Sequence, residues 1–170
     1  MKGCYCLIIS MKKSDKLKIG NLYQDHKFKK GYYVYIGSAM NSLVARINRH
    51  LSDDKKMHWH IDYFLSGEES EIRDVLFNIS DKKIECDLAS LIAEDGEEIP
   101  KFGCSDCSCN SHLIYFKRKK DAMNSVKSAY NNLNIEYYNL NYFKTELEKN
   151  ILKKNKKKKK KKKKSYEKHN

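Results

Sequence analysis

The sequence predicts an α/β protein of the α+β type, with a small antiparallel β-sheet flanked by helices and a disordered C-terminal tail. Two segments rich in apolar, aromatic and β-branched residues, Cys4–Met11 and Tyr32–Gly37, predict buried strands. Apolar residues at helical spacing from Leu43 to Leu51 predict an amphipathic helix directly after the second strand. The unbroken lysine run Lys156–Lys164 repels itself and predicts a disordered end.

The segment between the two main strands is polar and predicts little regular structure. Leu17–Leu22 predicts a short strand around Gly20, as part of a hairpin insertion, and Tyr23–Lys30 predicts a polar loop. A turn at residues 38–41 then leads into the helix, with Asn41 or Ser42 as its N-cap.

Beyond the first helix, alternating and β-rich patterns predict three more strands, over His58–Tyr63, Glu71–Ile79 and Leu113–Phe116. A helix is the alternative for the first of these segments. Apolar residues at helical spacing predict a second helix that begins near Glu85 and ends before Gly96.

The chain of 170 residues has the length of about one domain. We expect a core domain over residues 1–117, a helical appendage over 118–148 and the disordered poly-lysine tail over 149–170. Mean hydropathy is −0.80, and no apolar run approaches the roughly 20 residues of a membrane span. The N-terminus reads as a strand and not as a signal peptide, so a cytoplasmic protein without a membrane partner is expected.

The net charge of +13 at pH 7 is concentrated in the tail. Residues 149–170 contain thirteen lysines and one acid, which leaves 22 Lys and Arg against 21 Asp and Glu in residues 1–148. Within that part, residues 1–50 carry a net +8, which favours a phosphate-facing surface there. The tail predicts either nonspecific nucleic-acid binding through counterion release or a low-complexity end that aids solubility.

Several residues of the first half suit phosphodiester hydrolysis. Tyr5 and Tyr35 lie on the two main strands, and the helix that follows presents Arg46 and His50 four residues apart on one face. An arginine can clamp a phosphate, and a nearby cation can favour the phenolate form of a tyrosine. A carboxylate that holds a hydrated Mg²⁺ completes such a site. Plain strand aromatics and a solvated arginine, as expected for Arg49, are the alternatives.

These residues resemble the GIY-YIG nuclease superfamily. Gly3-Cys4-Tyr5 matches the first motif, with cysteine where isoleucine is common, and Tyr35-Ile36-Gly37 matches the second motif fully. Arg46 matches the arginine of the first helix, and His50 the histidine or tyrosine often found one turn later. The thirty residues from Tyr5 to Tyr35 exceed the usual spacing. The resemblance covers roughly residues 1–117, and the chain looks like one uncharacterised subgroup, whose members stand alone or are fused to a DNA-repair glycosylase.

The resemblance implies a role for each matched residue. Tyr5 is implied as general base on water, Tyr35 as its hydrogen-bonding partner, Arg46 on the phosphate and Glu85 on Mg²⁺ (or Mn²⁺). His50 is implied to assist proton transfer or to bind phosphate. For Glu85 the alternative is a favourable charge at a helix N-terminus. The late asparagine of the family is assigned here to Asn110.

Two further groups of polar residues have a structural and a functional interpretation. His58, His60 and Asp62 share one face of the predicted strand, which we interpret as a polar face, with His60 and Asp62 as second-layer or phosphate contacts. The loop over residues 100–111 and His112 carry a zinc pattern with the four candidates Cys104, Cys107, Cys109 and His112. Because four ligands in nine residues need sharp turns, reduced cysteines that shape a loop are the preferred interpretation.

The sequence therefore predicts a Mg²⁺-dependent endonuclease that hydrolyses phosphodiester bonds in DNA or another nucleic acid, including repair or branched intermediates. A non-catalytic nucleic-acid-binding module with the same fold is the main alternative. A structural or adaptor domain, in which the lysine tail does the binding, is the third.

Overall fold

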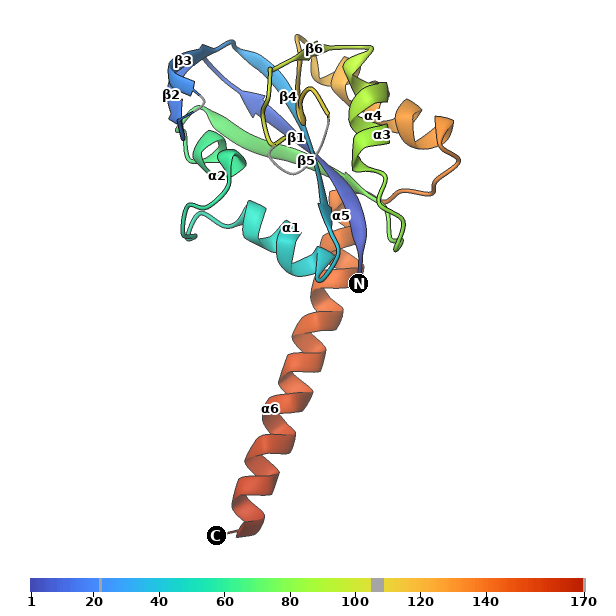
Figure 1. The fold of residues 1–170 in the computed structure, drawn as a ribbon. Helices are drawn as coiled ribbons and strands as arrows, with labels where there is room; N and C mark the ends of the chain where they lie inside the picture. The colour runs from blue at the N-terminus through green and yellow to red at the C-terminus, as the bar shows by residue number, and fades with distance from the viewer. Residues whose placement is uncertain (22, 105–108, 170) are drawn as a thin grey trace.

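In the computed structural model the chain forms a five-stranded antiparallel sheet and a separate two-stranded sheet, flanked by helices (Figure 1). The structure describes residues 1–21, 23–104 and 109–169. The strands are β1 Gly3–Met11, β2 Asp15–Ile19, β3 Tyr23–Phe28, β4 Gly31–Ala39, β5 Ser70–Phe77, β6 Glu97–Glu98 and β7 Leu113–Phe116. The helices are α1 Leu43–Leu51, α2 His60–Leu65, α3 Glu85–Ala93, α4 Lys119–Asn132, α5 Leu140–Tyr142, the π-helical segment η1 Phe143–Glu148, and α6 Lys149–His169. The α+β class with a small antiparallel sheet is confirmed.

The larger sheet has the strand order β5-β1-β4-β7-β6, and every residue of β1 is buried. Both predicted main strands are confirmed as the neighbours β1 and β4, and the predicted strands near 71–79 and 113–116 are confirmed as β5 and β7. The insertion between the motifs folds as the hairpin β2–β3, so residues 23–28 form a strand where a loop was predicted. Pairing with β2 satisfies the backbone of β3 although most of its side chains are polar and exposed.

Helices cover both faces of the sheet, so the apolar core has two layers (Figure 1). Leu7 and Ile9 of β1 face a core that includes residues of α1, α2 and η1. Cys6 and Ile8 point to the opposite face, which α3 and α4 cover. This alternation follows from the two-residue period of a strand and places the side chain of Tyr5 on the face of α1.

The prediction of a strand over His58–Tyr63 is wrong, because α2 begins at His60. The carboxylate of Asp62 accepts hydrogen bonds from the backbone N–H groups of His58 at 3.0 Å and Trp59 at 2.9 Å. An acidic side chain at the third helical position that caps the preceding backbone is a helix-start signal. This local cap outweighs the alternating pattern.

The core continues past the boundary predicted at residue 117. Tyr130 of α4 and Phe143 of η1 are fully buried, and the backbone of Tyr138 pairs with Phe77 of β5. The segment 118–148 is therefore an integral part of the domain and not an appendage.

The tail forms the single helix α6, which extends away from the body of the protein (Figure 1). The sequence predicts disorder here because of charge repulsion. Lysine nevertheless has a high intrinsic helix propensity, and the segment contains no glycine or proline. In the part of the chain that the structure describes, no helix combines the length and apolarity that crossing a membrane requires.

Candidate active site

The pairing of β1 with β4 brings the two motif tyrosines together. Tyr5 lies opposite Gly37, and Leu7 lies opposite Tyr35. Because side chains two residues apart share a face of a sheet, Tyr5 and Tyr35 are diagonal neighbours on the same face. Their ring centroids are 6.5 Å apart. The antiparallel register therefore explains how motifs thirty residues apart can form one site.

Helix α1 positions the two polar residues of the motif against this face. The hydroxyl of Ser42 caps the helix by accepting from the backbone N–H of Ala45 at 3.2 Å, which confirms one of the two predicted N-caps. Arg46 donates from Nη1 to the carbonyl of Ser38 at 3.2 Å, and its guanidinium lies 4.4 Å from the ring centre of Trp59. Both contacts hold the arginine side chain beside the end of β4.

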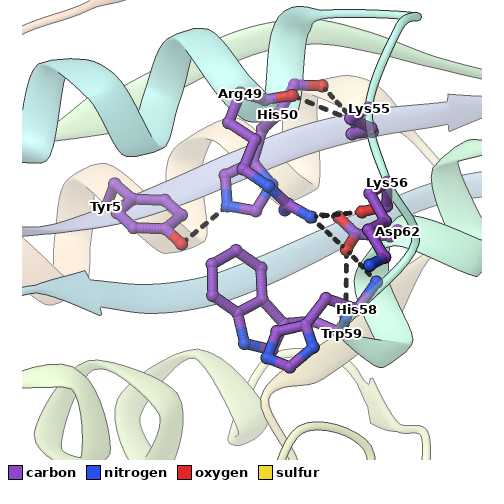
Figure 2. A network of polar contacts seen from close by, with 8 residues as sticks. All are labelled: Tyr5, Arg49, His50, Lys55, Lys56, His58, Trp59 and Asp62. Atoms are coloured by element: carbon purple, nitrogen blue, oxygen red, sulfur yellow. Dashed lines mark hydrogen bonds and ion pairs between the residues drawn. The ribbon is translucent and has the colours of Figure 1, made fainter.

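Tyr5 and His50 form a buried hydrogen bond, with 2.7 Å between the Tyr5 hydroxyl and His50 Nε2 (Figure 2). The resemblance implied Tyr35 as the partner of Tyr5, but the structure gives this position to His50. Tyr35 contacts both rings, with its centroid 6.1 Å from that of His50. Of the groups that the structure describes, none forms a hydrogen bond with the buried Nδ1 of His50.

Burial sets the protonation of this pair. Burial raises the pKa of the Tyr5 hydroxyl, while the charge and the hydrogen bond of Arg46 act in the opposite direction. Burial lowers the pKa of His50 to about 3, helped by the positive charge of Lys55. At neutral pH the site therefore contains a phenol next to a neutral imidazole.

A second layer holds Trp59 and, through it, Arg46. Arg49 donates from Nη1 and Nη2 to the two carboxylate oxygens of Asp62, each at 2.8 Å, and its guanidinium lies 4.3 Å from the ring centre of Trp59 (Figure 2). The expectation of a solvated Arg49 is therefore wrong. Although burial raises the pKa of Asp62, hydrogen bonds from Arg49 and the backbone hold it below its ordinary value. Asp62 is thus committed to a structural ion pair.

Glu85 is the first residue of α3, on the other side of the sheet, and its carboxylate lies 3.7 Å from the ammonium of the exposed Lys83. It reaches a pocket of about 280 Å³ that collects residues from β1, β4, α1, the start of α2, the start of α3 and the segment before β7. The residues that line this pocket are Tyr5, Tyr35, Gly37, Ser38, Arg46, His58, Trp59, His60, Ile61, Lys83, Glu85, Gly103 and His112.

Most of the predicted site residues meet in or beside this pocket. Tyr5, Tyr35, Arg46, Glu85 and His60 line it, and His50 lies directly behind Tyr5. Asn110 is exposed, and its backbone carbonyl accepts a hydrogen bond from the N–H of Lys101 at 2.8 Å. It is not among the described residues that line the pocket. The sequence did not indicate Trp59 or Lys83. Trp59 stacks on Arg46 and Arg49 of a separate helix, and Lys83 reaches the pocket from the segment before α3, so no local pattern marks either.

The structure brings together two of the four predicted zinc ligands, and it adds a third residue that was not predicted. Cys109 and His112 lie close to Cys86, the second residue of α3, which the sequence did not indicate. The sulfurs of Cys86 and Cys109 are in contact as a disulfide pair, where reduced thiols were expected. Cys104 donates from Sγ to the carbonyl of Phe102 at 3.3 Å, and Cys107 lies outside the described residues.

Fold and site together define an α+β domain whose central strand pair carries a tyrosine–histidine–arginine pocket with one carboxylate at its edge. The chain belongs to the family described as "Domain of unknown function DUF123", whose model matches residues 4–135. The matched region contains every residue of the pocket and also includes α4, beyond the boundary predicted at residue 117. No curated protein and no solved structure matches the chain.

Proposed function

We propose that the protein is a divalent-metal-dependent endonuclease that hydrolyses phosphodiester bonds in DNA. The observation that carries the proposal is the convergence of Tyr5, Tyr35, Arg46 and Glu85 on one pocket. These are the residues to which the GIY-YIG resemblance assigns the chemistry. A phenol, a guanidinium and a carboxylate are groups that phosphodiester hydrolysis can use to activate water and to stabilise charge.

Tyr5 and His50 are the proposed proton-transfer pair. Burial opposes a free phenolate, so Tyr5 acts best when its own proton has an acceptor at the moment it takes a proton from water. His50 Nε2, at 2.7 Å, is that acceptor, and the imidazole is neutral at the working pH. Tyr5 takes the proton lost by water as its own proton passes to His50, and His50, with its low pKa, releases that proton to solvent. The leaving oxygen, on the opposite side of the phosphorus, takes its proton from water.

Arg46 is the proposed phosphate ligand. Its guanidinium lines the pocket, and its contacts with Trp59 and the Ser38 carbonyl fix its position before substrate arrives. Such preorganised donors stabilise the charge that develops on the phosphoryl oxygens. Arg49 is already paired with Asp62 and so serves to position Trp59 instead.

Glu85 is the proposed ligand of Mg²⁺ or Mn²⁺. Among the described residues that line the pocket it is the one carboxylate, which suits Mg²⁺ because this ion often takes one or two protein carboxylates and keeps several waters. A bound Mg²⁺ supplies neutralisation of phosphoryl charge and a more acidic water. Lys83, whose ammonium lies 3.7 Å away, is the exposed member of this pair, with 61% of its side chain exposed against 13% for Glu85.

The test is cleavage of labelled branched, nicked and duplex DNA with and without Mg²⁺. We expect wild type to cut at least one substrate only with metal, and Tyr5→Phe, Arg46→Ala and Glu85→Gln each to lose roughly 100-fold or more in rate. Tyr33→Phe is the matched control for Tyr5→Phe, because Tyr33 is equally buried but its hydroxyl bonds to the Lys29 carbonyl. Asp87→Asn, an exposed acid on the same helix turn, is the control for Glu85→Gln.

Two results would overturn the proposal. One is the absence of cleavage across the whole panel by folded wild-type protein. The other is cleavage by Tyr5→Phe and Arg46→Ala at the wild-type rate. Salt-sensitive DNA binding without cleavage that persists after residues 149–170 are removed identifies the alternative, a nucleic-acid-binding module with the same fold.

A further inference from the structure

Cys86, Cys109 and His112 form a cluster beside the pocket that the proposed hydrolysis does not use. One ligand-capable atom from each residue lies within 4.8 Å of the other two. Cys86 belongs to the first turn of α3, whereas Cys109 and His112 belong to the segment before β7. His112 is buried and the two cysteines are half-buried. Three soft or borderline ligands from two separate segments therefore converge at one place.

We propose that Cys86, Cys109 and His112 bind a structural zinc ion that fastens the loop before β7 to the N-terminus of α3. Thiolate sulfur and imidazole nitrogen are the ligands that zinc prefers in structural sites. A tetrahedral zinc with bonds of about 2.0–2.3 Å separates its ligand atoms by about 3.5–3.8 Å, which the cluster can accommodate. The inference does not depend on the proposed nuclease activity.

The three ligands come from two separate segments of the chain, so the tight spacing that argued against zinc in the sequence does not apply to them. Four ligands within the nine residues from Cys104 to His112 need sharp turns. In the structure, Cys109 and His112 supply a pair with two residues between them, and Cys86 approaches from a helix on another part of the chain. Structural zinc sites usually draw two ligand pairs from separate elements. This cluster supplies one pair and one further ligand, so a water completes the tetrahedral coordination in the proposed site.

Backbone hydrogen bonds hold His112 in place without the ion. The N–H of His112 donates to the carbonyl of Phe102 at 2.8 Å, and the carbonyl of His112 accepts from Ile36 of β4 at 2.9 Å. The buried hydroxyl of Ser111 accepts from the N–H of Leu113 at 3.0 Å. The backbone that carries the imidazole of His112 is therefore fixed to β4 and to the segment around Phe102.

His112 supplies a third ligand, which a zinc site uses and a disulfide does not. Cys86 and Cys109 have Cα atoms 6.1 Å apart, a separation that fits a disulfide. A disulfide requires no third group, but an imidazole lies next to both sulfurs. In the reduced protein these sulfurs are not bonded to each other, and rotation about the Cα–Cβ bonds can separate them enough for both thiolates to bind one ion together with the imidazole.

The position of the cluster indicates what the zinc stabilises. Cys86 directly follows Glu85, and His112 itself lines the pocket. An ion bound here fixes the pocket wall that carries the carboxylate relative to the central strand β4. Zinc in this role is structural and takes no part in bond cleavage.

The first experiment measures metal content by mass spectrometry on untagged full-length protein purified with a phosphine reductant. We expect one zinc per chain in wild type and less than about a tenth of that in Cys86→Ala, Cys109→Ala and His112→Ala. Cys6→Ala is the matched control, because Cys6 is fully buried in β1 and lies outside the cluster, and it should keep its zinc. Absence of stoichiometric zinc in wild type, or equal loss in Cys6→Ala, overturns the proposal.

A second measurement on wild type avoids variants that fail to fold. The denatured, unreduced protein is alkylated after chelation, and the modified thiols are counted by mass. Modification of all six cysteines supports a zinc site, whereas modification of only four identifies a Cys86–Cys109 disulfide and overturns it. Replacement of zinc by Co²⁺ should produce thiolate-to-cobalt charge-transfer absorption, and its absence also counts against the site.

Discussion

The hydroxyl of Tyr5 packs directly over the backbone of Gly37, its partner in the antiparallel register. A Cβ atom at position 37 would lie 2.5 Å from the Tyr5 hydroxyl oxygen and 2.6 Å from the ring carbon that bears it. No real Cβ tolerates such a contact, so the space above Gly37 belongs to the tyrosine. Tyr5, the tyrosine of the first motif, can therefore occupy its place only because the second motif has a glycine at position 37.

This relationship predicts the effect of Gly37→Ala. The added methyl group must push the Tyr5 ring away from His50, which we expect to cost about 1–3 kcal/mol of stability. The proposed cleavage should fall about as far as in Tyr5→Phe. Urea unfolding and cleavage rates are the measurements.

Gly67→Ala provides the control for this substitution, because the nearest atom to a Cβ there is the mobile end of the Asp15 carboxylate, at 3.1 Å. Gly67→Ala should change neither the free energy of unfolding nor the cleavage rate by much. A Gly37→Ala protein that keeps wild-type activity would show that the packing of Tyr5 over Gly37 does not position the hydroxyl.

Local sequence patterns predicted the parts of the site that lie within single elements. The buried run in β1, the strand β4 and the capped helix α1 each have a local signal, and the antiparallel pairing of β1 with β4 then places Tyr5 beside Tyr35. Arg46 and His50 follow from helical spacing. Glu85 follows from the start of the second helix.

The remaining features depend on contacts between distant segments, which no local pattern encodes. The hydrogen bond from Tyr5 to His50 spans 45 positions, and the pairing of Arg49 with Asp62 joins two helices. The approach of Cys86 to His112 requires the packing of α3 beside β4. The polar composition after residue 117 concealed buried residues such as Phe143.

The lowered pKa of His50 predicts a stability that falls at acid pH. Its pKa is about 3 in the folded protein and about 6.5 in the unfolded chain, so only the unfolded state binds a proton between these values. The contribution is complete above pH ~6.5 and is lost as the pH falls toward ~3. At pH ~4.5 the loss reaches about 3 kcal/mol, since each unit corresponds to about 1.4 kcal/mol.

Urea unfolding at pH ~7 and ~4.5 measures this effect in wild type and His50→Gln. The variant should lose about 3 kcal/mol less than wild type between the two pH values. Asp62 and His112 also have lowered pKa values, so they too lower the stability at acid pH. Because this loss of stability occurs in both wild type and His50→Gln, the difference between the two proteins reports His50 alone. His26→Gln, on an exposed strand, should behave as wild type, and equal acid sensitivity in His50→Gln would contradict the prediction.

The ion pair between Arg49 and Asp62 predicts a large effect from a residue outside the pocket. Asp62 is fully buried, so Arg49→Ala leaves an uncompensated charge, and we expect a loss of about 2–3 kcal/mol. Adding Asp62→Asn should recover part of this loss, because the amide carries no charge. Thermal and urea unfolding of the single and double variants measure the coupling.

Arg73→Ala is the matched control, because Arg73 pairs at 3.5 Å with the exposed Glu71. This surface pair should contribute less than about 1 kcal/mol. If Arg49→Ala is no more destabilising than Arg73→Ala, Asp62 does not depend on the pairing.

Phe143 predicts where the folded domain ends. Its ring is fully buried against Phe77 of β5, with centroids 6.1 Å apart, so Phe143→Ala should cost about 3–5 kcal/mol. A chain that ends at residue 117 should not fold, whereas one that ends at residue 148 should. Tyr63→Ala, at a 38% exposed aromatic residue, is the control and should cost far less. Cooperative unfolding of the shorter chain would restore the boundary at residue 117.

The lysines of α6 predict salt-sensitive binding that is separable from chemistry. Lys156–Lys164 present nine consecutive positive charges on a helix that extends from the domain. Replacing all nine by glutamine should weaken DNA binding and flatten its dependence on salt, because each lost phosphate contact removes about 0.9 from the slope. The rate of the proposed cleavage at saturating DNA should stay within about twofold, since no described residue of α6 lines the pocket.

The same nine positions changed to arginine keep the charge and should keep the slope. If the glutamine variant retains the wild-type slope, the tail does not bind DNA, and if its saturated rate collapses, α6 contributes to the site itself.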